Sequence, residues 1–327
     1  MNKEEQINAL LKLTSKMISL TEISEILEIS NLEVLGLVKE LSKKGVNIVI
    51  QRKDDDIYLY NQGERDLTGE NTYQFKTNSK NEFKFVAIAD TRFGSKYQQL
   101  SILNDIYQKA YDNGYNNVIL CGNISEGLYP LTNLYSEDNF LDDSLEQVKY
   151  IVDNYPKVDG IKTYFITGPK DEKHLKNNKI NIGKRISKER NDLIYLGHNS
   201  CNVEIDKTKV LVISSPLQKT YTVSYRPQQH IDSFRSEDKP EILLFGGQLQ
   251  MEKFTYRSVH CLSIPSVCAT SRAMSDKRYA NTIGAWYVTV KTDEYGNFLE
   301  VTAFDSVYYK TNKDDYIKSK ALVLKKD

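Results

Sequence analysis

The chain has 327 residues, of which 40% are hydrophobic and 27% are charged. That composition is typical of a globular protein and excludes a disordered chain. Lys and Arg together number 44, as do Asp and Glu together, so no overall charge draws the chain toward nucleic acid or anionic lipid. No apolar run approaches the roughly 20 residues that span a bilayer, and the charged N-terminus is not typical of a signal peptide.

The first 61 residues combine helical periodicity with a short alternating ribbon. The expected helices and strands cover residues 4–18, 22–27, 31–44, 46–50 and 57–60. Ser30 and Glu33 form a Ser-x-x-Glu capping box, which is a strong start signal for the third helix. Three helices followed by a two-stranded ribbon resemble the winged helix-turn-helix family.

The winged-helix resemblance implies that the third helix enters the major groove of double-stranded DNA and that the ribbon tip lies beside the backbone. The residues expected to contact DNA are Asn31, Lys39, Lys43, Lys44, Arg52 and Lys53. The charge balance opposes this, because residues 1–61 hold eight Lys and Arg against ten Asp and Glu, a net charge of −2. The alternative is a winged helix that contacts a protein complex or forms a homodimer through its first helix.

Residues 62–81 are polar and aperiodic, so we expect a linker there. Residues 82–310 alternate buried strands with helices, which predicts a layered α/β (α+β) domain with ligand loops at the strand ends. The expected strands and helices are 83–89, 100–113, 118–121, 142–155, 163–167, 210–214, 242–245, 286–290 and 299–303. Residues 311–327 form a C-terminal tail.

Five polar segments each follow one of these strands. They are Asp90-Thr91-Arg92, Gly122-Asn123, Gly168-Pro169-Lys170-Asp171, Ser214-Ser215-Pro216 and Gly247-Gln248-Leu249-Gln250. Their order and spacing resemble the metal-binding loops of calcineurin-like metallophosphoesterases. The domain order, with a winged helix before this domain, resembles that of members of the family encoded by bacteriophages. The resemblance implies a β-sandwich flanked by helices and, in active relatives, phosphate-ester hydrolysis by two divalent metal ions.

The metal ligands that the resemblance implies are almost all replaced. An active relative would show Asp-x-His, Gly-Asp, Gly-Asn-His-Asp/Glu, a strand-end His and Gly-His-x-His. Only Asp90 remains as a candidate metal ligand; the degenerate positions are Arg92, Asn123, Pro169, Lys170, Ser215, Gln248 and Gln250. Asp171 persists at a position that usually supports the loop. A guanidinium offers no lone pair, so we expect no cofactor, with weakly bound manganese or another divalent metal as the alternative.

Arg92 and Lys170 bring positive charge to the place where divalent cations would lie. One hypothesis is that they replace the metals electrostatically, either by pairing with Asp90 or by holding a phosphate without cleaving it. The alternative is that both residues arose by sequence drift after catalysis was lost, and that both side chains point to solvent. The four histidines, His174, His198, His230 and His260, include no pair at helical spacing, so we expect no relocated metal site.

The function expected from these patterns is non-catalytic. The leading hypothesis is a phosphoesterase-fold protein with a winged helix that acts as a DNA-associated regulator or as a scaffold in a nucleic-acid-processing assembly, like the degraded phosphoesterase domains of eukaryotic replicative polymerases. The alternatives are a metal-dependent phosphodiesterase or nuclease with an atypical site, and a nucleotide- or phosphate-sensing regulator. The four cysteines lack metal-site spacing, so we expect free thiols and a cytoplasmic protein without membrane contact.

Overall fold

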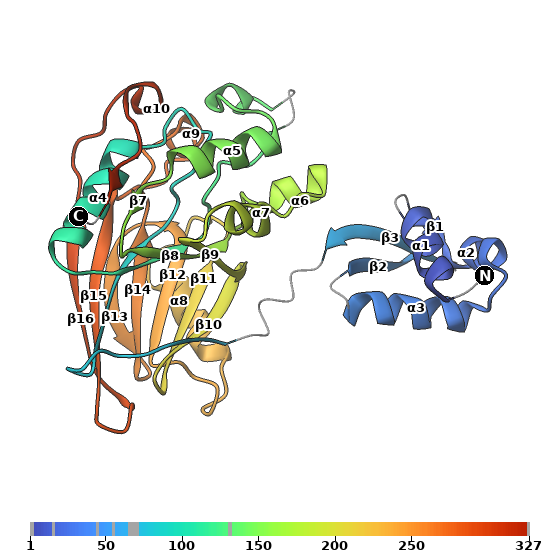
Figure 1. The fold of residues 1–327 in the computed structure, drawn as a ribbon, viewed down its shortest axis with the longest axis horizontal. Coiled ribbons are helices and arrows are strands. Elements are labelled where there is room, and N and C mark those ends of the chain that lie inside the picture. The colour runs from blue at the N-terminus through green and yellow to red at the C-terminus, as the bar shows by residue number, and fades with distance from the viewer. Residues whose placement is uncertain are drawn as a thin grey trace. The chain divides into compact units, whose positions relative to one another are not determined.

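The computed structural model describes residues 3–14, 17–43, 46–53, 56–64, 72–129 and 133–325. The chain divides into two compact units, Met1–Leu67 with Leu175–Asn181, and Thr68–His174 with Ile182–Asp327. Figure 1 shows the helices and strands of each unit. No described helix has both the length and the apolar character needed to cross a membrane.

The smaller unit contains three helices and a three-stranded antiparallel sheet. Its elements are α1 (Lys3–Leu13), β1 (Ile18–Ser19), α2 (Leu20–Leu27), α3 (Asn31–Lys43), β2 (Val46–Lys53) and β3 (Asp56–Glu64), with the sheet order β1-β3-β2. The helices bury their apolar faces against one another and against β3, and Leu10, Ile23, Val34 and Leu59 are fully buried in this core. The apolar periodicity predicted the three helices and the β2-β3 ribbon. It missed β1: the helix expected over residues 4–18 ends at Leu13, and Ile18 pairs with β3 instead.

The start of α3 follows the capping box predicted from the sequence. The Glu33 carboxylate accepts hydrogen bonds from the Ser30 amide at 2.8 Å and from the Ser30 hydroxyl at 2.7 Å. In return, the Glu33 amide donates to Ser30 Oγ at 3.3 Å. Hydrogen bonds from Ser30 hold the pKa of Glu33 below its usual value. This carboxylate caps the helix, which is how a Ser-x-x-Glu pair stabilises a helix start.

Gly36 is an exposed glycine within α3, and a Cβ built there meets nothing within 4 Å. We expect Gly36→Ala to stabilise α3 by about 0.5–1 kcal/mol, because alanine loses less backbone entropy than glycine in a helix. Slower hydrogen exchange of the α3 amides would measure this. Gly114→Ala is the matched control: that site is equally open but its φ is +70°, so the same change should destabilise the protein. Faster exchange in Gly36→Ala would contradict the prediction.

The larger unit contains two mixed six-stranded sheets, which confirms the predicted α/β class. The first has the order β16-β15-β5-β6-β8-β9 and the second β13-β14-β12-β11-β10-β4. The strands of the first are β5 (Glu82–Ile88), β6 (Asn117–Cys121), β8 (Lys162–Thr167), β9 (Leu193–His198), β15 (Gly284–Thr292) and β16 (Phe298–Val307). Those of the second are β4 (Tyr73–Phe75), β10 (Ser200–Ile205), β11 (Thr208–Ser214), β12 (Ile242–Leu249), β13 (Glu252–Tyr256) and β14 (Val259–Pro265).

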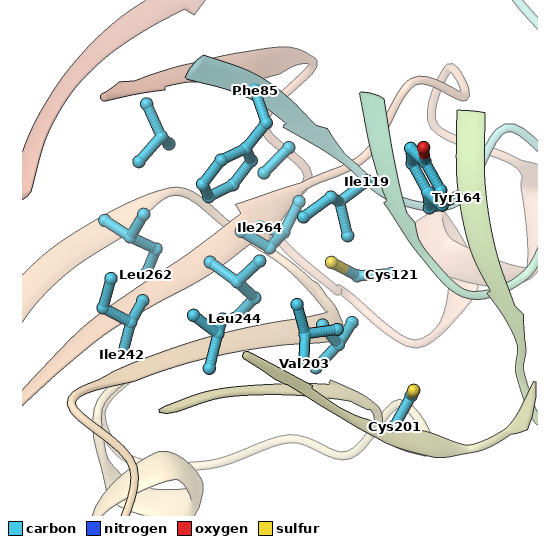
Figure 2. Packing of buried hydrophobic residues seen from close by; sticks show 14 of the residues in the cluster. Phe85, Ile119, Cys121, Tyr164, Cys201, Val203, Ile242, Leu244, Leu262 and Ile264 are labelled. Carbon is cyan, nitrogen blue, oxygen red and sulfur yellow. The ribbon is translucent and has the colours of Figure 1, made fainter. Parts of the chain in front are cut away.

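Strands β5, β6, β8 and β9 run parallel, as do β11, β12 and β14. The two sheets face each other across a common apolar core (Figure 2), to which the first sheet contributes Phe85 and Ile119 and the second contributes Val203, Leu244 and Ile264. This arrangement is a sandwich, and parallel strands in both layers direct several strand ends to one edge of it.

Helices accompany the sandwich. They are α4 (Leu100–Asp112), α5 (Ser144–Asn154), α7 (Ile182–Glu189), α8 (Tyr225–Ser233), α9 (Arg272–Asp276) and α10 (Asp315–Lys318), beside the short η2 (Ser136–Asp138). The helix α6 (Glu172–Asn178) begins in this unit, and its residues from Leu175 belong to the smaller unit. Tyr107 of α4 shares a 2.5 Å hydrogen bond with Thr163 of β8, which fixes α4 on the first sheet. On the second sheet, Ile231 of α8 packs in a buried cluster with Leu243 and Phe245.

Two boundaries differ from the sequence expectation. β4 lies inside the predicted linker 62–81 but pairs with β10, so these residues belong to the second sheet; residues 65–71 lie outside the described residues. In the predicted tail 311–327, β17 (Val323–Leu324) pairs with β7 (Lys157–Val158), and buried Asp315 accepts a hydrogen bond from the Ser101 amide at 2.9 Å. Both segments are too short to show a hydrophobic period, and a local pattern does not reveal pairing with strands that are distant in sequence.

Candidate functional site

The five polar segments meet at one edge of the sandwich. The Asp90 amide donates to Gly122 O at 3.0 Å, and the Ser215 amide donates to Gly246 O at 3.1 Å. A Cβ atom added at Gly122 would lie 2.0 Å from Ser214 Oγ, and one added at Gly168 would lie 2.3 Å from it. Side chains at Gly122 and Gly168 would therefore clash with the fourth segment, so glycine is needed for the loops to pack this closely. The convergence of these segments, expected from their places after strands, is present in the structure.

Several residues of these segments adopt left-handed backbone conformations. Asp90, Arg92, Asn123 and Leu249 have φ values of 54°, 47°, 55° and 63°. Such conformations cost of order 1–3 kcal/mol for residues other than glycine and persist only where the surroundings enforce them. Strain of this kind is concentrated at functional sites, and here it recurs in three of the five segments.

Asp90 is fully buried and its carboxylate is committed to internal partners. Oδ1 accepts hydrogen bonds from Arg92 Nε at 2.9 Å and from Asn123 Nδ2 at 3.0 Å, and it lies 2.9 Å from Arg92 Nη2. Oδ2 has no hydrogen-bond partner among the described residues. Arg92 and Asn123, two of the positions predicted to be degenerate, hold the Asp90 carboxylate by hydrogen bonds.

Arg92 points into the protein, which contradicts the alternative that it faces solvent. Its side chain is 3% exposed, and its Nη1 lies 3.9 Å from Glu126 Oε2. Burial disfavours the charged guanidinium, but Asp90 and Glu126 outweigh burial and raise the pKa of Arg92 above its usual value. Arg92 is therefore a fixed cation between two buried carboxylates.

Lys170 is the second cation, and its partner is Glu126, which the sequence analysis missed. Lys170 Nζ forms an ion pair with Glu126 Oε1 and donates to Tyr129 Oη at 2.8 Å, while Tyr129 Oη donates to Glu126 at 2.7 Å. Burial opposes ionisation of Glu126, but Lys170 and Arg92 outweigh it and lower the pKa of Glu126. Burial lowers the pKa of Lys170. Attraction to Glu126 acts to raise this pKa, and repulsion from Arg92 acts to lower it further.

These four side chains alternate in sign, and we call them the buried ion-pair cluster: Asp90, Arg92, Glu126 and Lys170. Two carboxylates and two cations give a formal charge of zero. Of the two roles predicted for the cations, the geometry favours pairing with carboxylates over holding a phosphate, because Arg92 and Lys170 each already contact a carboxylate.

Asp171 organises the second and third segments. Its carboxylate accepts hydrogen bonds from the amides of Gly168 at 2.8 Å, Ile124 at 3.2 Å and Ser125 at 2.8 Å, and from the Ser125 hydroxyl at 2.7 Å. Burial raises the pKa of Asp171 to about 6, against these hydrogen bonds. The supporting role expected for Asp171 agrees with this geometry.

His174 extends the same hydrogen-bond network. Its Nε2 lies 3.0 Å from Ser125 Oγ and its Nδ1 lies 2.9 Å from Ser144 Oγ. Burial, followed by repulsion from Lys173, lowers the pKa of His174 to about 4. A neutral imidazole with both nitrogens in hydrogen bonds acts as a structural residue.

The fourth and fifth segments contribute less to the cluster than predicted. Ser214, rather than Ser215, places its hydroxyl beside Gly122 and Gly168. Ser215 Oγ and both polar side-chain atoms of buried Gln248 have no hydrogen-bond partner among the described residues. Gln250 is half-buried just beyond β12.

The donor groups do not fit a divalent metal site. Across the described part of the chain, no three His, Cys, Asp or Glu side chains gather in a metal-binding arrangement. Of the buried carboxylates at these segments, Asp90 and Glu126 each contact a cation, and Asp171 already accepts hydrogen bonds from three backbone amides. A divalent ion would have to displace Arg92 or Lys170 or lie against their charge, which hard-cation sites avoid. The four cysteines are all buried and free, as predicted.

The predicted DNA-contacting residues lie in the smaller unit. Asn31, Lys39 and Lys43 are exposed on α3, and Arg52 is exposed on β2. Lys39 and Lys43 are one helical turn apart and so share a face of α3. Lys44 lies outside the described residues, as does the side chain of Lys53.

Comparison with known proteins gives only distant structural similarity. No protein-family model matches the chain, and no curated protein matches it. A solved archaeal phosphodiesterase is 10% identical over 69% of this chain and 100% of its own, with a TM-score of 0.39. Vacuolar Protein Sorting 29 from Cryptosporidium parvum is 15% identical over 70% of this chain and 99% of its own, with a TM-score of 0.35. A hypothetical protein from Pyrococcus horikoshii OT3 is 16% identical over 72% of this chain and 92% of its own, with a TM-score of 0.38.

Proposed function

We propose that the larger unit is a calcineurin-like phosphoesterase domain that no longer hydrolyses phosphate esters and acts instead in binding. The observation that carries this proposal is the buried ion-pair cluster. Its members Asp90, Arg92 and Lys170 occupy the strand-end positions at which an active relative would present metal ligands. The cations pair with the carboxylates in place of metal ions, so the segments keep their strained conformations without a metal.

Two-metal hydrolysis needs anionic and neutral donors that are free to bind the ions. In this cluster Asp90 Oδ1 already has three donor atoms within 3.0 Å, and Glu126 is held by Lys170 and Tyr129. No general acid is supplied at the third segment either, because Pro169 and Lys170 stand where a relative carries Asn and His. The residues therefore favour a stable, charge-neutral cluster over a reactive site.

The catalytic alternative is tested by hydrolysis of bis-p-nitrophenyl phosphate with manganese. We expect the release of p-nitrophenol to equal that of a protein-free blank, since Arg92 and Lys170 exclude divalent ions by charge. Asp90→Ala serves as the control for contaminating enzymes. Hydrolysis by the unmodified chain that disappears in Asp90→Ala would establish the phosphodiesterase or nuclease alternative and end the non-catalytic proposal.

We further propose that the smaller unit is a winged helix-turn-helix that associates with double-stranded DNA through α3. The support is the shared exposed face of Lys39 and Lys43, together with the capping of Glu33 by Ser30, which commits that carboxylate to the helix start. The larger unit would then act as a regulator or scaffold attached to a DNA-associated module. The alternative is that this face of α3 binds a protein partner instead of DNA.

Gel retardation of duplex DNA at several salt concentrations tests this association. Charge reversal of Lys39 and Lys43 to Glu should abolish retardation, because phosphate neutralisation supplies most non-specific affinity and affinity falls steeply with salt. The matched control reverses two exposed lysines of the larger unit, Lys277 and Lys310, and changes the net charge equally. Equal loss in both variants, or no retardation of the unmodified chain, would shift the assignment to a protein scaffold.

A further inference from the structure

A hollow of the larger unit is lined by residues of α8, β10 and β11. Its volume is about 730 Å³, which lies within the roughly 300–1,000 Å³ of ordinary ligand pockets. Its walls come from β10, β11, α8 and the segment that follows α8, and none of the four members of the buried ion-pair cluster lines it. It is therefore distinct from that cluster, although Ser214, Ser215 and Pro216 of the fourth polar segment belong to its lining.

One end of the hollow is polar and tightly built. Ser215 and Asn199 line it, and Ser215 Oγ and Asn199 Oδ1 are buried atoms without a hydrogen-bond partner among the described residues. Alternation along β11 from Leu211 and Ile213 carries the side chain of Ser215 toward this same face. Buried polar atoms left unpaired cost about 1–3 kcal/mol each, so a ligand that pairs with them gains affinity.

Arg226 supplies positive charge at this end. Its Nη1 donates to Pro216 O, and this contact holds the guanidinium at the segment that contains Ser215. His230, one turn later on α8, also lines the hollow. Among the described residues neither Arg226 nor His230 forms an ion pair with a carboxylate. Burial lowers the pKa of Arg226, as expected for a half-buried cation whose charge is not compensated.

The rest of the lining combines apolar and polar residues. Leu211, Ile213 and Phe234 supply apolar surface. The other charged lining residues are Lys209 and Asp238, which are exposed, and Glu204, which is half-buried. A ligand that fits must therefore combine an anionic group with an apolar body. A guanidinium fork matches phosphate oxygens in two parallel hydrogen bonds, and a serine hydroxyl donates a third.

We propose that this hollow binds a phosphomonoester with a planar apolar body, of the size of a nucleoside monophosphate. The phosphate contacts Arg226 and Ser215, and the body lies against Phe234. His230 and Asn199 contribute further polar contacts at the same end. This ligand is bound and not cleaved. A phosphate-sensing role would then belong to α8, and the paired cations Arg92 and Lys170 would have no part in it.

Isothermal titration of the full chain with adenosine 5′-monophosphate tests the proposal, with adenosine and inorganic phosphate as separate probes. Saturable binding of the monophosphate is expected, with affinities for adenosine and for inorganic phosphate at least tenfold weaker. Arg226→Gln should weaken binding of the monophosphate at least tenfold, and Ser215→Ala several-fold, since hydrogen bonds to charged groups are the stronger ones. Arg235→Gln changes an exposed arginine just beyond α8 and should leave the affinity within twofold.

Hydrogen exchange separates loss of the site from loss of folding. The monophosphate should slow exchange of the α8 amides in the unmodified chain, and Arg226→Gln should keep the unliganded exchange pattern. Three results would each overturn the proposal: no saturable binding of the monophosphate at millimolar concentration, equal binding of adenosine, or equal affinities of Arg226→Gln and the unmodified chain. Hydrolysis assays are independent of all three, so failure here is distinguishable from failure of the non-catalytic proposal.

Discussion

Replacement of Arg92 by methionine is expected to lower the free energy of unfolding of the larger unit by about 3–5 kcal/mol. The side chain of Arg92 is 3% exposed and lies between Asp90 and Glu126, so its removal leaves buried carboxylate charge without compensation. Methionine keeps much of the volume and removes the charge. Urea unfolding followed by the fluorescence of Trp286, which lies in the core between the sheets, measures the loss.

The double variant Asp90→Asn with Arg92→Met should regain a large part of that stability. Removal of both charges eliminates the unpaired anion, and replacing a buried ion pair as a unit is often nearly neutral. Arg185→Met, at an exposed arginine of α7, is the control and should change stability by less than about 0.5 kcal/mol. If Arg92→Met is as stable as Arg185→Met, the buried ion-pair cluster does not stabilise the site.

His174 is expected to make the larger unit less stable in mild acid. Its pKa is lowered from 6.5 to about 4 in the folded protein, so between these values the unfolded chain binds more protons. The stability contributed by neutral His174 is fully present above pH 6.5 and is lost as pH falls toward 4. The shift corresponds to about 3 kcal/mol over that window.

His174→Gln isolates this effect, because glutamine keeps hydrogen-bonding groups but does not titrate in this range. The unfolding free energy of the unmodified chain, measured between pH 7 and pH 4, should decline more steeply than that of the variant. Asp171 acts in the opposite sense: its pKa is raised to about 6, so the folded state binds the extra proton between about 4 and 6. Asp171 is present in both proteins, so the difference between them reports His174. Parallel curves would show that His174 does not titrate as described.

The elements predicted from periodicity are those with long or strongly apolar patterns. The expected strand 83–89 is β5 (Glu82–Ile88), and the expected helix 100–113 is α4 (Leu100–Asp112). Strands β9 and β10 were missed because only a sharp turn at His198 and Asn199 separates them, and polar residues interrupt β10. Asn199 has φ of 61°, a turn conformation that asparagine tolerates.

The missed site residue is Glu126. It lies four residues beyond Gly122, outside the five segments, in a stretch without a recognisable motif. Its importance comes from Lys170, 44 residues later in the chain, whose Nζ it binds. A single carboxylate beside an apolar run was the available signal, since buried acidic residues are rare unless they are paired.

The sequence by itself determined the α/β class, the positions of the five polar segments after strands, the residue types in those segments and the helix start at Ser30. These depend on local periodicity, residue chemistry and hydrogen bonds between residues close in the chain. Only the tertiary structure decided that Arg92 and Lys170 are neutralised by Asp90 and Glu126, and that Arg226 is not paired with a carboxylate among the described residues. The direction of a side chain and the partner of a buried charge depend on packing between segments distant in sequence, and pairing stabilises a charge that burial alone would not tolerate.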